Sequence, residues 1–399
     1  MQWKILVVFG TRPEAIKLCP VVSCLRRFPD LYRVRVAVTA QHREMLDQVL
    51  GAFCLTPDHD LDLMLPGQTL AQTAARAIAA LDAVIEAEAP DMVLVQGDTT
   101  TTLCGALAAF YRQVPVAHVE AGLRTGDFSQ PFPEEMNRVL ATRLSSLHLA
   151  ATERAAANLR AEGIAARDIA VTGNTVIDAL LHVRDGLDSG RLVRPEWPWL
   201  DESKRLLLVT AHRRESFGPG LERICSALLR LAARRDVQIA CTVHPNPQVQ
   251  QPLRRLLDGR AGIELLDPLD YVPFVDLMRR AHILITDSGG VQEEGPSLGK
   301  PILVLREKTE RPEAVQAGTV KLVGSDPRRI LEGAEQLLDS PAAYGRMARV
   351  HNTYGDGHAA ERIESAIRSF FDKKSGSIPT QKLPGSTHMN LQPQMTGVH

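Results

Sequence analysis

The stretch from His282 to Glu294, HILITDSGGVQEE, passes from an apolar run through a glycine turn into a helical pattern. The run His282–Thr286 has almost no polar alternation, which is typical of a strand buried on both faces of a parallel sheet. Gly289 and Gly290 follow it, and Glu294 comes one turn into the expected helix. A strand that turns tightly into a helix is the repeating element of α/β folds, and the turn lies where such folds bind ligands.

The same order of strand and helix recurs on both sides of this stretch. Expected strands are Lys4–Phe9, Val34–Thr39, Met92–Gln96 and Val116–Val119 in the first half, and Arg205–Thr210, Gln238–Val243, Ile263–Leu266, His282–Thr286 and Ile302–Leu305 in the second. Helices are expected after Glu14 to about Phe28, and at Glu44–Ala52, Thr69–Glu88 and Thr100–Tyr111. The pattern predicts an α/β protein with two Rossmann-like, doubly wound parallel-sheet domains.

A length of 399 residues also suits about two domains. The boundary is expected within residues 173–199, where the Pro- and Trp-rich segment 194–199 suits a surface connection. We therefore predict an N-terminal domain over residues 1–172 and a C-terminal domain over residues 173–359. Residues 373–399 are rich in Ser, Gly, Pro, Gln and Thr, which predicts a disordered tail.

The charge and the cysteines limit the class of protein. Lys and Arg total 46 against 47 Asp and Glu, a formal net charge of −1, which argues against bulk binding to nucleic acid or acidic membranes. The amino-terminal apolar run is too short to span a bilayer and has no signal-peptide cleavage region. None of the six cysteines forms a CxxC pair, which fits a reduced compartment. We expect a cytoplasmic protein without nucleic-acid or membrane partners.

Polar side chains stand at the carboxyl ends of the expected strands. The positions are Arg12 with Lys17 one turn later, Asp98, Glu120, His212, His244, and the run Asp287-Ser288-Gly289-Gly290. A single Asp or Ser there often only caps the next helix. All of them together favour a ligand site, because open α/β sheets bind ligands at this edge.

The composition of this edge favours an anionic ligand. A glycine turn at a helix start presents backbone N–H groups to phosphate oxygens. Arg12, Lys17, Arg213 and Arg311 add charges that could together neutralise a diphosphate, although an isolated arginine is more often a surface ion pair. No strand leads into GxGxxG, and GxxxxGK[ST], HExxH and clustered Cys/His ligands are absent. We therefore expect no tightly held NAD, no metal and no other cofactor.

Several motifs, in order over about residues 3–370, resemble the bacterial, non-hydrolysing UDP-N-acetylglucosamine 2-epimerase family. They are Gly10-Thr-Arg-Pro-Glu-Ala-Ile-Lys17, Thr39-Ala-Gln-His-Arg-Glu-Met-Leu-Asp-Gln48, Gly97-Asp-Thr-Thr-Thr-Thr102, His118-Val-Glu-Ala-Gly-Leu-Arg-Thr-Gly126, Pro133-Glu-Glu135, His212-Arg-Arg-Glu-Ser216, Asp287–Glu294 and Thr309-Glu-Arg-Pro-Glu313. No single motif is specific, but the series in register is.

The resemblance implies a GT-B-like fold, in which two Rossmann-like domains face a central cleft and a C-terminal helix, at about residues 360–372, returns to the first. It also implies a homodimer that interconverts UDP-GlcNAc and UDP-ManNAc, which supplies ManNAc units for cell-surface polysaccharide. The C2 proton is not next to a carbonyl, so the implied route is anti elimination of UDP to 2-acetamidoglucal, followed by re-addition. That route needs acid and base groups at C2 and donors for the leaving diphosphate.

The resemblance also assigns roles to residues. Asp98, Glu120 and Glu134 match the family's acids and bases, without showing which is which, and His212 matches a contact to the diphosphate or leaving oxygen. Positions that match substrate contacts are Arg12, Lys17, Arg138, Arg213, Leu269 and Phe274 (the uracil pocket for the last two), the diphosphate loop Ser288, Gly289 and Gly290, the ribose contact Glu294, and Arg311.

Some members of the family use a second UDP-GlcNAc as an activator. Gln41, His42, Glu134, Arg213 and His244 match that second site, whereas Glu44 and Gly67 depart from residues that some members use there. Allosteric activation is therefore a separate hypothesis.

Other functions remain open at this point. A GT-B glycosyltransferase with a UDP-sugar donor shares the fold. A hydrolysing epimerase, an epimerase for a modified UDP-GlcNAc derivative, and a non-catalytic nucleotide-sugar sensor are further alternatives. The sensor is disfavoured, because all three carboxylates are present.

Overall fold

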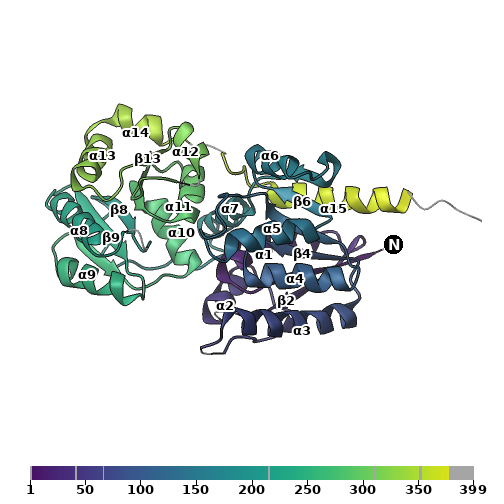
Figure 1. Cartoon of the computed structure of the whole chain (residues 1–399). Helices are drawn as coiled ribbons and strands as arrows, with labels where there is room; N and C mark the ends of the chain where they lie inside the picture. Colours follow the sequence, from purple (N-terminus) through teal and green to yellow (C-terminus); the bar gives the residue numbers. More distant parts are fainter. Residues whose placement is uncertain are drawn as a thin grey trace, which may run out of the picture.

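The computed structural model describes residues 2–40, 43–65, 67–213, 216–309, 311–349 and 353–376. Two α/β bodies lie side by side, each a parallel sheet covered by helices (Figure 1). The first sheet contains β1 (Trp3–Phe9), β2 (Tyr32–Val38), β3 (His59–Asp60), β4 (Met92–Gln96), β5 (Val116–Ala121), β6 (Leu147–Ala150) and β7 (Ile169–Val171). Its helices are α1 (Arg12–Leu25), α2 (Arg43–Ala52), α3 (Leu70–Glu88), α4 (Thr100–Tyr111), α5 (Glu134–Leu144) and α6 (Glu153–Ala161), with a 3-10 turn η1 (Ala166–Asp168).

Helix α7 (Thr175–Asp188) leads to the second body. Its strands are β8 (Arg205–Thr210), β9 (Val237–Thr242), β10 (Ile263–Leu266), β11 (Ile283–Thr286), β12 (Ile302–Val304) and β13 (Val320–Leu322). Its helices are α8 (Pro219–Ala232), α9 (Pro247–Leu257), α10 (Tyr271–Arg280), α11 (Gly289–Glu294), η3 (Gly295–Leu298), α12 (Pro312–Gln316), α13 (Pro327–Asp339) and α14 (Pro341–Met347), and the chain closes with α15 (Ala359–Gly376).

Both sheets are doubly wound. The strand orders are β3-β2-β1-β4-β5-β6-β7 and β10-β9-β8-β11-β12-β13, and every strand pair is parallel. The order reverses between β1 and β4 in one sheet and between β8 and β11 in the other, and such switch points are where open α/β sheets bind ligands. This arrangement confirms the predicted fold class.

Four of the short strands were not predicted. β3, β6, β7 and β13 have two to four residues each, too few to show a period. β5 also runs further than the expected Val116–Val119, through Glu120 to Ala121. Glu120 has a φ of +62°, and the register of β5 against β6 shifts at this residue. A non-glycine residue with positive φ is uncommon, and it often belongs to a functional site.

Helices α7 and α15 tie the two bodies together. Ile177 and Leu180 of α7 belong to one apolar cluster with Leu18 of α1 and Val275 of α10. Helix α15 lies against the first body, where Phe371 stacks on Trp3 with ring centroids 4.6 Å apart (Figure 1). Because α7 contacts helices of both bodies, the boundary between residues 172 and 173 stays a prediction.

The last helix is longer than expected. It begins at Ala359 and ends at Gly376, so Lys373–Gly376 belong to a helix and not to the tail predicted from residue 373. Lys373 and Lys374 lie in its last turn, where positive charge is favourable to the helix dipole. The rest of the predicted tail lies outside the described residues.

Within the described ranges, no helix combines the length and apolar character that crossing a bilayer requires. In the same part of the chain, no group of three His, Cys, Asp or Glu side chains is arranged to hold a metal ion.

Candidate active site

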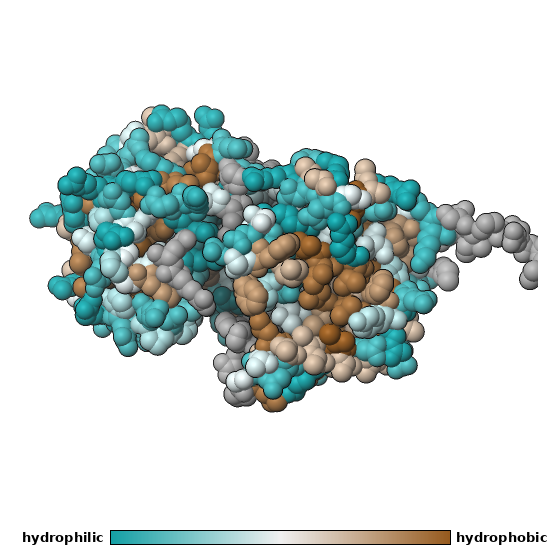
Figure 2. Space-filling model, in the orientation of Figure 1, coloured by the Kyte–Doolittle hydropathy of each residue, from teal (hydrophilic) through white to brown (hydrophobic). Residues whose placement is uncertain are grey.

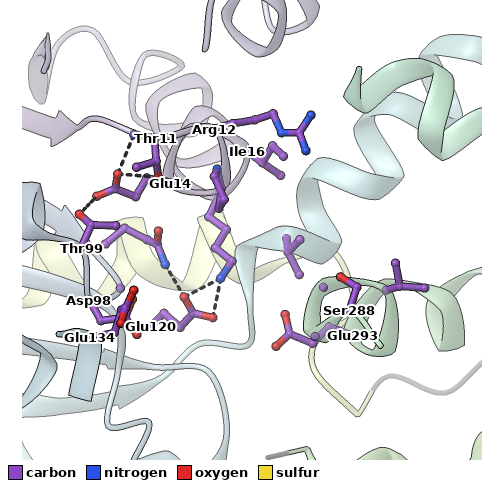
Figure 3. Close-up of a pocket in the computed structure, with 18 of the residues that line it drawn as sticks. Thr11, Arg12, Glu14, Ile16, Asp98, Thr99, Glu120, Glu134, Ser288 and Glu293 are labelled. Atoms are coloured by element: carbon purple, nitrogen blue, oxygen red, sulfur yellow. Dashed lines mark hydrogen bonds and ion pairs between the residues drawn. The ribbon is translucent and has the colours of Figure 1, made fainter. Parts of the chain in front are cut away.

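The carboxyl ends of both sheets open onto one cleft of about 950 Å³. The turns after β1 and β4 lie at one switch point, and the turns after β8 and β11 lie at the other. Residues of all four turns line the cleft. In Figure 3, the acidic side chains Asp98, Glu120 and Glu134 lie on one side of this space, with Ser288 and Glu293 across from them.

Glu120 is held by partners from three elements. The ammonium Nζ of Lys17 lies 2.7 and 2.6 Å from its two carboxylate oxygens (Figure 3). Gln96 donates to Oε2, and Asn174 donates to Oε1 at 3.1 Å. Burial by itself would raise the pKa of Glu120, but Lys17, with smaller contributions from Arg311 and Arg138, outweighs burial and lowers the pKa. Burial also disfavours the charged form of Lys17, but the nearby Glu120 raises the pKa of Lys17 above its ordinary value. The two side chains therefore form a buried ion pair. The sequence led us to expect a contact between Lys17 and the nucleotide. In the structure, the ammonium group of Lys17 pairs with the carboxylate of Glu120.

Asp98 is the second carboxylate of this wall, and it behaves differently. Arg138 donates to its Oδ2, and the side chain of Asn137 donates to its backbone oxygen at 2.9 Å. Burial raises the pKa of Asp98, Arg138 opposes that shift, and the nearby Glu120 adds to it. A carboxyl group with a raised pKa beside one with a lowered pKa can act as an acid and base pair.

Helix α5 supplies the third carboxylate. Glu134 is its first residue and lines the cleft, next to Asp98 in Figure 3. Arg138 lies one turn further along the helix, and its Nη1 is 3.1 Å from Glu135. Arg138 therefore holds Asp98 from the same helix that presents Glu134.

Glu14 joins the two turns of this wall and was not predicted as a site residue. Its Oε2 accepts from the backbone N–H of Gly10 at 3.0 Å and of Thr11 at 2.8 Å. Its Oε1 accepts from the hydroxyls of Thr99 at 2.6 Å and Thr102 at 3.1 Å. The capping box Thr11-x-x-Glu14 was the available sequence signal. Only the fold brings Thr99 next to it.

The second wall begins with His212. The buried Asp287 accepts at Oδ2 from the backbone N–H of His212 at 2.7 Å and of Arg213 at 2.8 Å. The Nδ1 of His212 lies 3.3 Å from Oδ1 of Asp287. Burial lowers the pKa of His212, and the nearby Asp287 offsets only part of this shift. His244 stacks on His212 with ring centroids 5.5 Å apart.

The glycine turn carries an arginine on its surface. A Cβ atom at Gly289 would lie 2.6 Å from Cζ of Arg311, so glycine is what allows the guanidinium to lie there. Arg311 Nε donates to Oε1 of Glu293 at 2.6 Å. Ser288 is the N-cap of α11 and makes no side-chain capping bond. The turn therefore combines a helix start with a cation, which is an arrangement suited to an anionic ligand.

Glu294 closes this wall. It accepts a hydrogen bond from the hydroxyl of Tyr271 at 2.8 Å. Burial raises the pKa of Glu294 to about 8 although Tyr271 opposes the shift. Across the cleft, Nη1 of Arg12 donates to the backbone oxygen of Leu269 at 3.2 Å and links the two walls.

All predicted site residues within the described ranges line this cleft. They are Arg12, Lys17, Asp98, Glu120, Glu134, Arg138, His212, Arg213, His244, Leu269, Phe274, Ser288, Gly289, Gly290, Glu294 and Arg311. Gln41 and His42 lie outside the described residues. Four further side chains were not singled out by the sequence. Gln96, Asn174 and Glu293 contact the predicted Glu120 or Arg311, and Glu14 joins the turns after β1 and β4 through Thr11 and Thr99.

The chain matches known proteins over most of its length. Residues 26–368 match the family model described as UDP-N-acetylglucosamine 2-epimerase. The UDP-N-acetylglucosamine 2-epimerase of Escherichia coli K12 is 52% identical over 371 residues, which cover 92% of this chain and 98% of that protein. The crystal structure of the Neisseria meningitidis UDP-GlcNAc 2-epimerase bound to UDP-GlcNAc is similar with a TM-score of 0.86 and 46% identity, and covers 92% of this chain and 100% of that chain.

A more distant likeness concerns the fold alone. A glycosyltransferase from Streptomyces nogalater has a TM-score of 0.58 at 16% identity, over 92% of this chain and 100% of its own. The two parallel sheets around one cleft thus define a protein of the GT-B-like fold class. The family match is more specific, and the chain belongs to the UDP-N-acetylglucosamine 2-epimerase family.

Proposed function

We propose that this chain interconverts UDP-GlcNAc and UDP-ManNAc by inverting C2 of the sugar, and so supplies ManNAc units for cell-surface polysaccharide. One observation carries the proposal: a single cleft has Asp98, Glu120 and Glu134 on one wall and the turn Ser288–Gly290 with Arg311 on the other. The first wall suits proton transfer, and the second suits a diphosphate.

The reaction is an elimination followed by an addition. A base removes the proton from C2 while the bond from C1 to the diphosphate oxygen breaks, so UDP leaves with the electron pair and 2-acetamidoglucal remains. An acid then delivers a proton to the opposite face of C2, and the diphosphate oxygen attacks C1 again. Anti elimination fits UDP-GlcNAc, because its C2 hydrogen and its C1 oxygen are on opposite faces. Water must stay out, since it would trap the intermediate.

The two walls divide the work in this proposal. Asp98, Glu120 and Glu134 exchange the C2 proton and stabilise positive charge that develops at C1. His212, Arg213 and Arg311, with the turn Ser288–Gly290, stabilise the leaving diphosphate. The contacts that hold the nucleoside are Arg12, the backbone at Leu269, Phe274 and Glu294.

Lys17 and Arg138 act mainly on the carboxylates. Lys17 bonds both oxygens of Glu120, and Arg138 bonds Asp98 and Glu135. We infer that they set the charge states of the two carboxylates, and that any contact they make with the substrate comes second.

Incubation with UDP-GlcNAc in deuterium oxide, without NAD or added metal, tests the proposal by proton NMR. The expected product is UDP-ManNAc with deuterium at C2. Free ManNAc with UDP would identify a hydrolysing enzyme instead. Nucleotide binding without exchange or product would contradict the proposal, and would favour a glycosyltransferase, a sensor or an enzyme for a modified UDP-GlcNAc.

A second UDP-GlcNAc is proposed as an activator. Glu134, Arg213 and His244 line the same cleft as the proposed catalytic groups, so a ligand held by them would adjoin the substrate. Activation predicts a sigmoidal dependence of rate on UDP-GlcNAc, and a reverse reaction that starts only when UDP-GlcNAc is added. A hyperbolic curve with no such requirement would contradict it.

A homodimer is proposed from an apolar surface of the first body. Phe110 and Tyr111 of α4 and Met136 and Leu140 of α5 are exposed, and these two helices contact each other. Figure 2 shows apolar residues gathered on this face. A surface of this kind typically marks a protein interface. Light scattering of the wild type and of Leu140→Lys tests it, with a dimer expected for the first and a monomer for the second.

A further inference from the structure

Asn174 stands where the chain crosses between the two bodies. The chain crosses between the bodies in two passages: the first is the segment from β7 into α7, and the second is the segment just before α15. The backbone N–H of Asn174 donates to the oxygen of Tyr354 at 2.6 Å, so the two passages touch at this residue. Asn174 is 3% exposed.

Each polar atom of the Asn174 side chain has a separate partner. Its Oδ1 accepts from the N–H of Val176 at 3.0 Å and caps α7. Its Nδ2 donates to Oε1 of Glu120 at 3.1 Å and to Oε2 of Glu293 at 3.3 Å. Ser, Thr or Asp would serve as the cap equally well. Only an amide both caps the helix and donates to two carboxylates.

The two carboxylates belong to different walls of the cleft. Glu120 is at the end of β5, and Glu293 is on α11 directly after the glycine turn. Lys17 bonds both oxygens of Glu120, and Arg311 bonds the Glu293 oxygen that Asn174 does not contact. The side chains therefore form a continuous row across the cleft floor, with a cation at each end, two anions inside and the neutral amide between the anions.

We propose that Asn174 is a positioning residue, which fixes the carboxylate of Glu120 relative to the diphosphate turn through Glu293 and Arg311. The inference rests on the proposed function, because it assigns Glu120 to proton transfer. Without the amide, the two carboxylates keep their cations but lose the one donor that they share, and they repel each other. A shift of Glu120 by about 1 Å is enough to lower turnover on the order of 100-fold.

Three variants separate positioning from folding. Asn174→Asp keeps the shape and the cap but has no N–H to donate. Asn174→Ser keeps a cap and is too short to reach the carboxylates, and it covers the case in which the added charge of Asn174→Asp prevents folding. Glu293→Gln removes the charge at the other side of the amide. Asn246→Asp is the matched control, because Asn246 caps α9 through Gln248 at 2.9 Å and no bond to a carboxylate is among its contacts in the described residues.

The assay is the deuterium NMR assay with UDP-GlcNAc, together with calorimetry of UDP binding and a thermal melt. For Asn174→Ser and Asn174→Asp we expect kcat to fall about 100-fold while the UDP dissociation constant stays within about 3-fold. Asn246→Asp should keep kcat within about 2-fold, as expected for an unperturbed surface cap. In the double variant Asn174→Ser with Glu293→Gln, kcat should stay within about 3-fold of the slower single variant, because residues that act as one network are not additive.

Three results would overturn the inference: an unchanged kcat in Asn174→Ser, a loss of UDP binding in proportion to kcat, or additive effects in the double variant. The wild type in the same assay keeps the two proposals apart. If the wild type does not epimerise UDP-GlcNAc, the proposed function fails; if it does and Asn174→Ser does too, only the positioning role fails.

Discussion

Glu120 and Glu294 are both buried glutamates of the same cleft, one on each wall, yet their environments act in opposite directions. Burial favours the neutral form of both. At Glu120, Lys17 together with Arg311 and Arg138 overcomes the effect of burial and lowers the pKa. At Glu294, the hydroxyl of Tyr271 does not overcome burial, and the pKa rises to about 8. The neighbouring Glu293 adds to the shift at Glu294.

Burial alone therefore does not set the charge state of a carboxyl group in this cleft. A full positive charge in contact keeps Glu120 ionised in a buried place, and a neutral hydroxyl lets Glu294 keep its proton near neutral pH. Such pairs with separated pKa values usually mark distinct roles. Here the ionised glutamate lies on the wall proposed for proton transfer, and the neutral one lies beside the turn proposed for the diphosphate.

The largest effect is expected for Glu120→Gln. The variant keeps the shape of the side chain. It loses the negative charge that pairs with Lys17 and that takes part in the proposed transfer of the C2 proton. The kcat for UDP-GlcNAc should fall about 1000-fold, equivalent to about 4 kcal/mol, with UDP binding kept. Glu222→Gln, which changes only a surface pair with Arg255, should behave as the wild type. A Glu120→Gln enzyme with more than about a tenth of the activity would exclude proton transfer by this residue.

The next effect concerns stability and pH, in Glu294→Gln. Below its ordinary value of 4.5, Glu294 is protonated in both states, and the folded state is not penalised. As pH rises from 4.5 through about 8, the unfolded chain loses this proton while the folded chain retains it, so the free energy of unfolding falls.

Glu294→Gln lacks this loss. The difference in free energy of unfolding between the variant and the wild type should therefore rise in favour of the variant by roughly 3 kcal/mol from pH 5 to pH 8. Urea denaturation at a series of pH values measures it. For the control Glu222→Gln, the free energy of unfolding should change with pH as it does for the wild type. Parallel curves for Glu294→Gln as well would show that Glu294 is ionised in the folded protein.

Gly289→Ala tests the second wall. The added Cβ would overlap the guanidinium of Arg311, so the guanidinium must shift from its place on the turn. The UDP dissociation constant should rise about 30-fold, or about 2 kcal/mol, by calorimetry, while kcat at saturation changes less. Gly345→Ala in α14 is the matched control, because nothing lies within 4 Å of its Cβ position. Equal affinity in Gly289→Ala and the wild type would remove Arg311 from the nucleotide site.

The smallest effect is expected for Arg12→Ala. This removes the bond to Leu269 that links the walls. One partly buried hydrogen bond contributes about 1 kcal/mol, so KM should rise about 5-fold with kcat nearly constant. Arg255→Ala supplies the control, with a surface ion pair only. A fall in kcat at constant KM would instead place Arg12 on the reacting part of the substrate.

Much of the cleft was predictable because ligand residues of α/β proteins stand directly after strands. Asp98, His212 and Gly289 each follow an apolar run, so their positions could be found from sequence order alone. Thr100–Tyr111 was predicted with the bounds that the structure has, since Thr99 caps it and an apolar run precedes it. The two-residue β3 and the bulge at Glu120 were missed, because neither leaves a periodic signal.

The sequence by itself determined the parallel α/β class, the turns and the family, since these depend on local periodicity and on motifs in order. Tertiary structure alone decided which partner each charge has. Lys17 lies on Glu120, 103 positions away, and Asn174 joins Glu120 to Glu293 across the two bodies. Periodicity and motifs report on neighbours along the chain. The pKa of a buried carboxylate depends on charges within a few ångströms, and those charges are brought there by strand order and by the packing of α7.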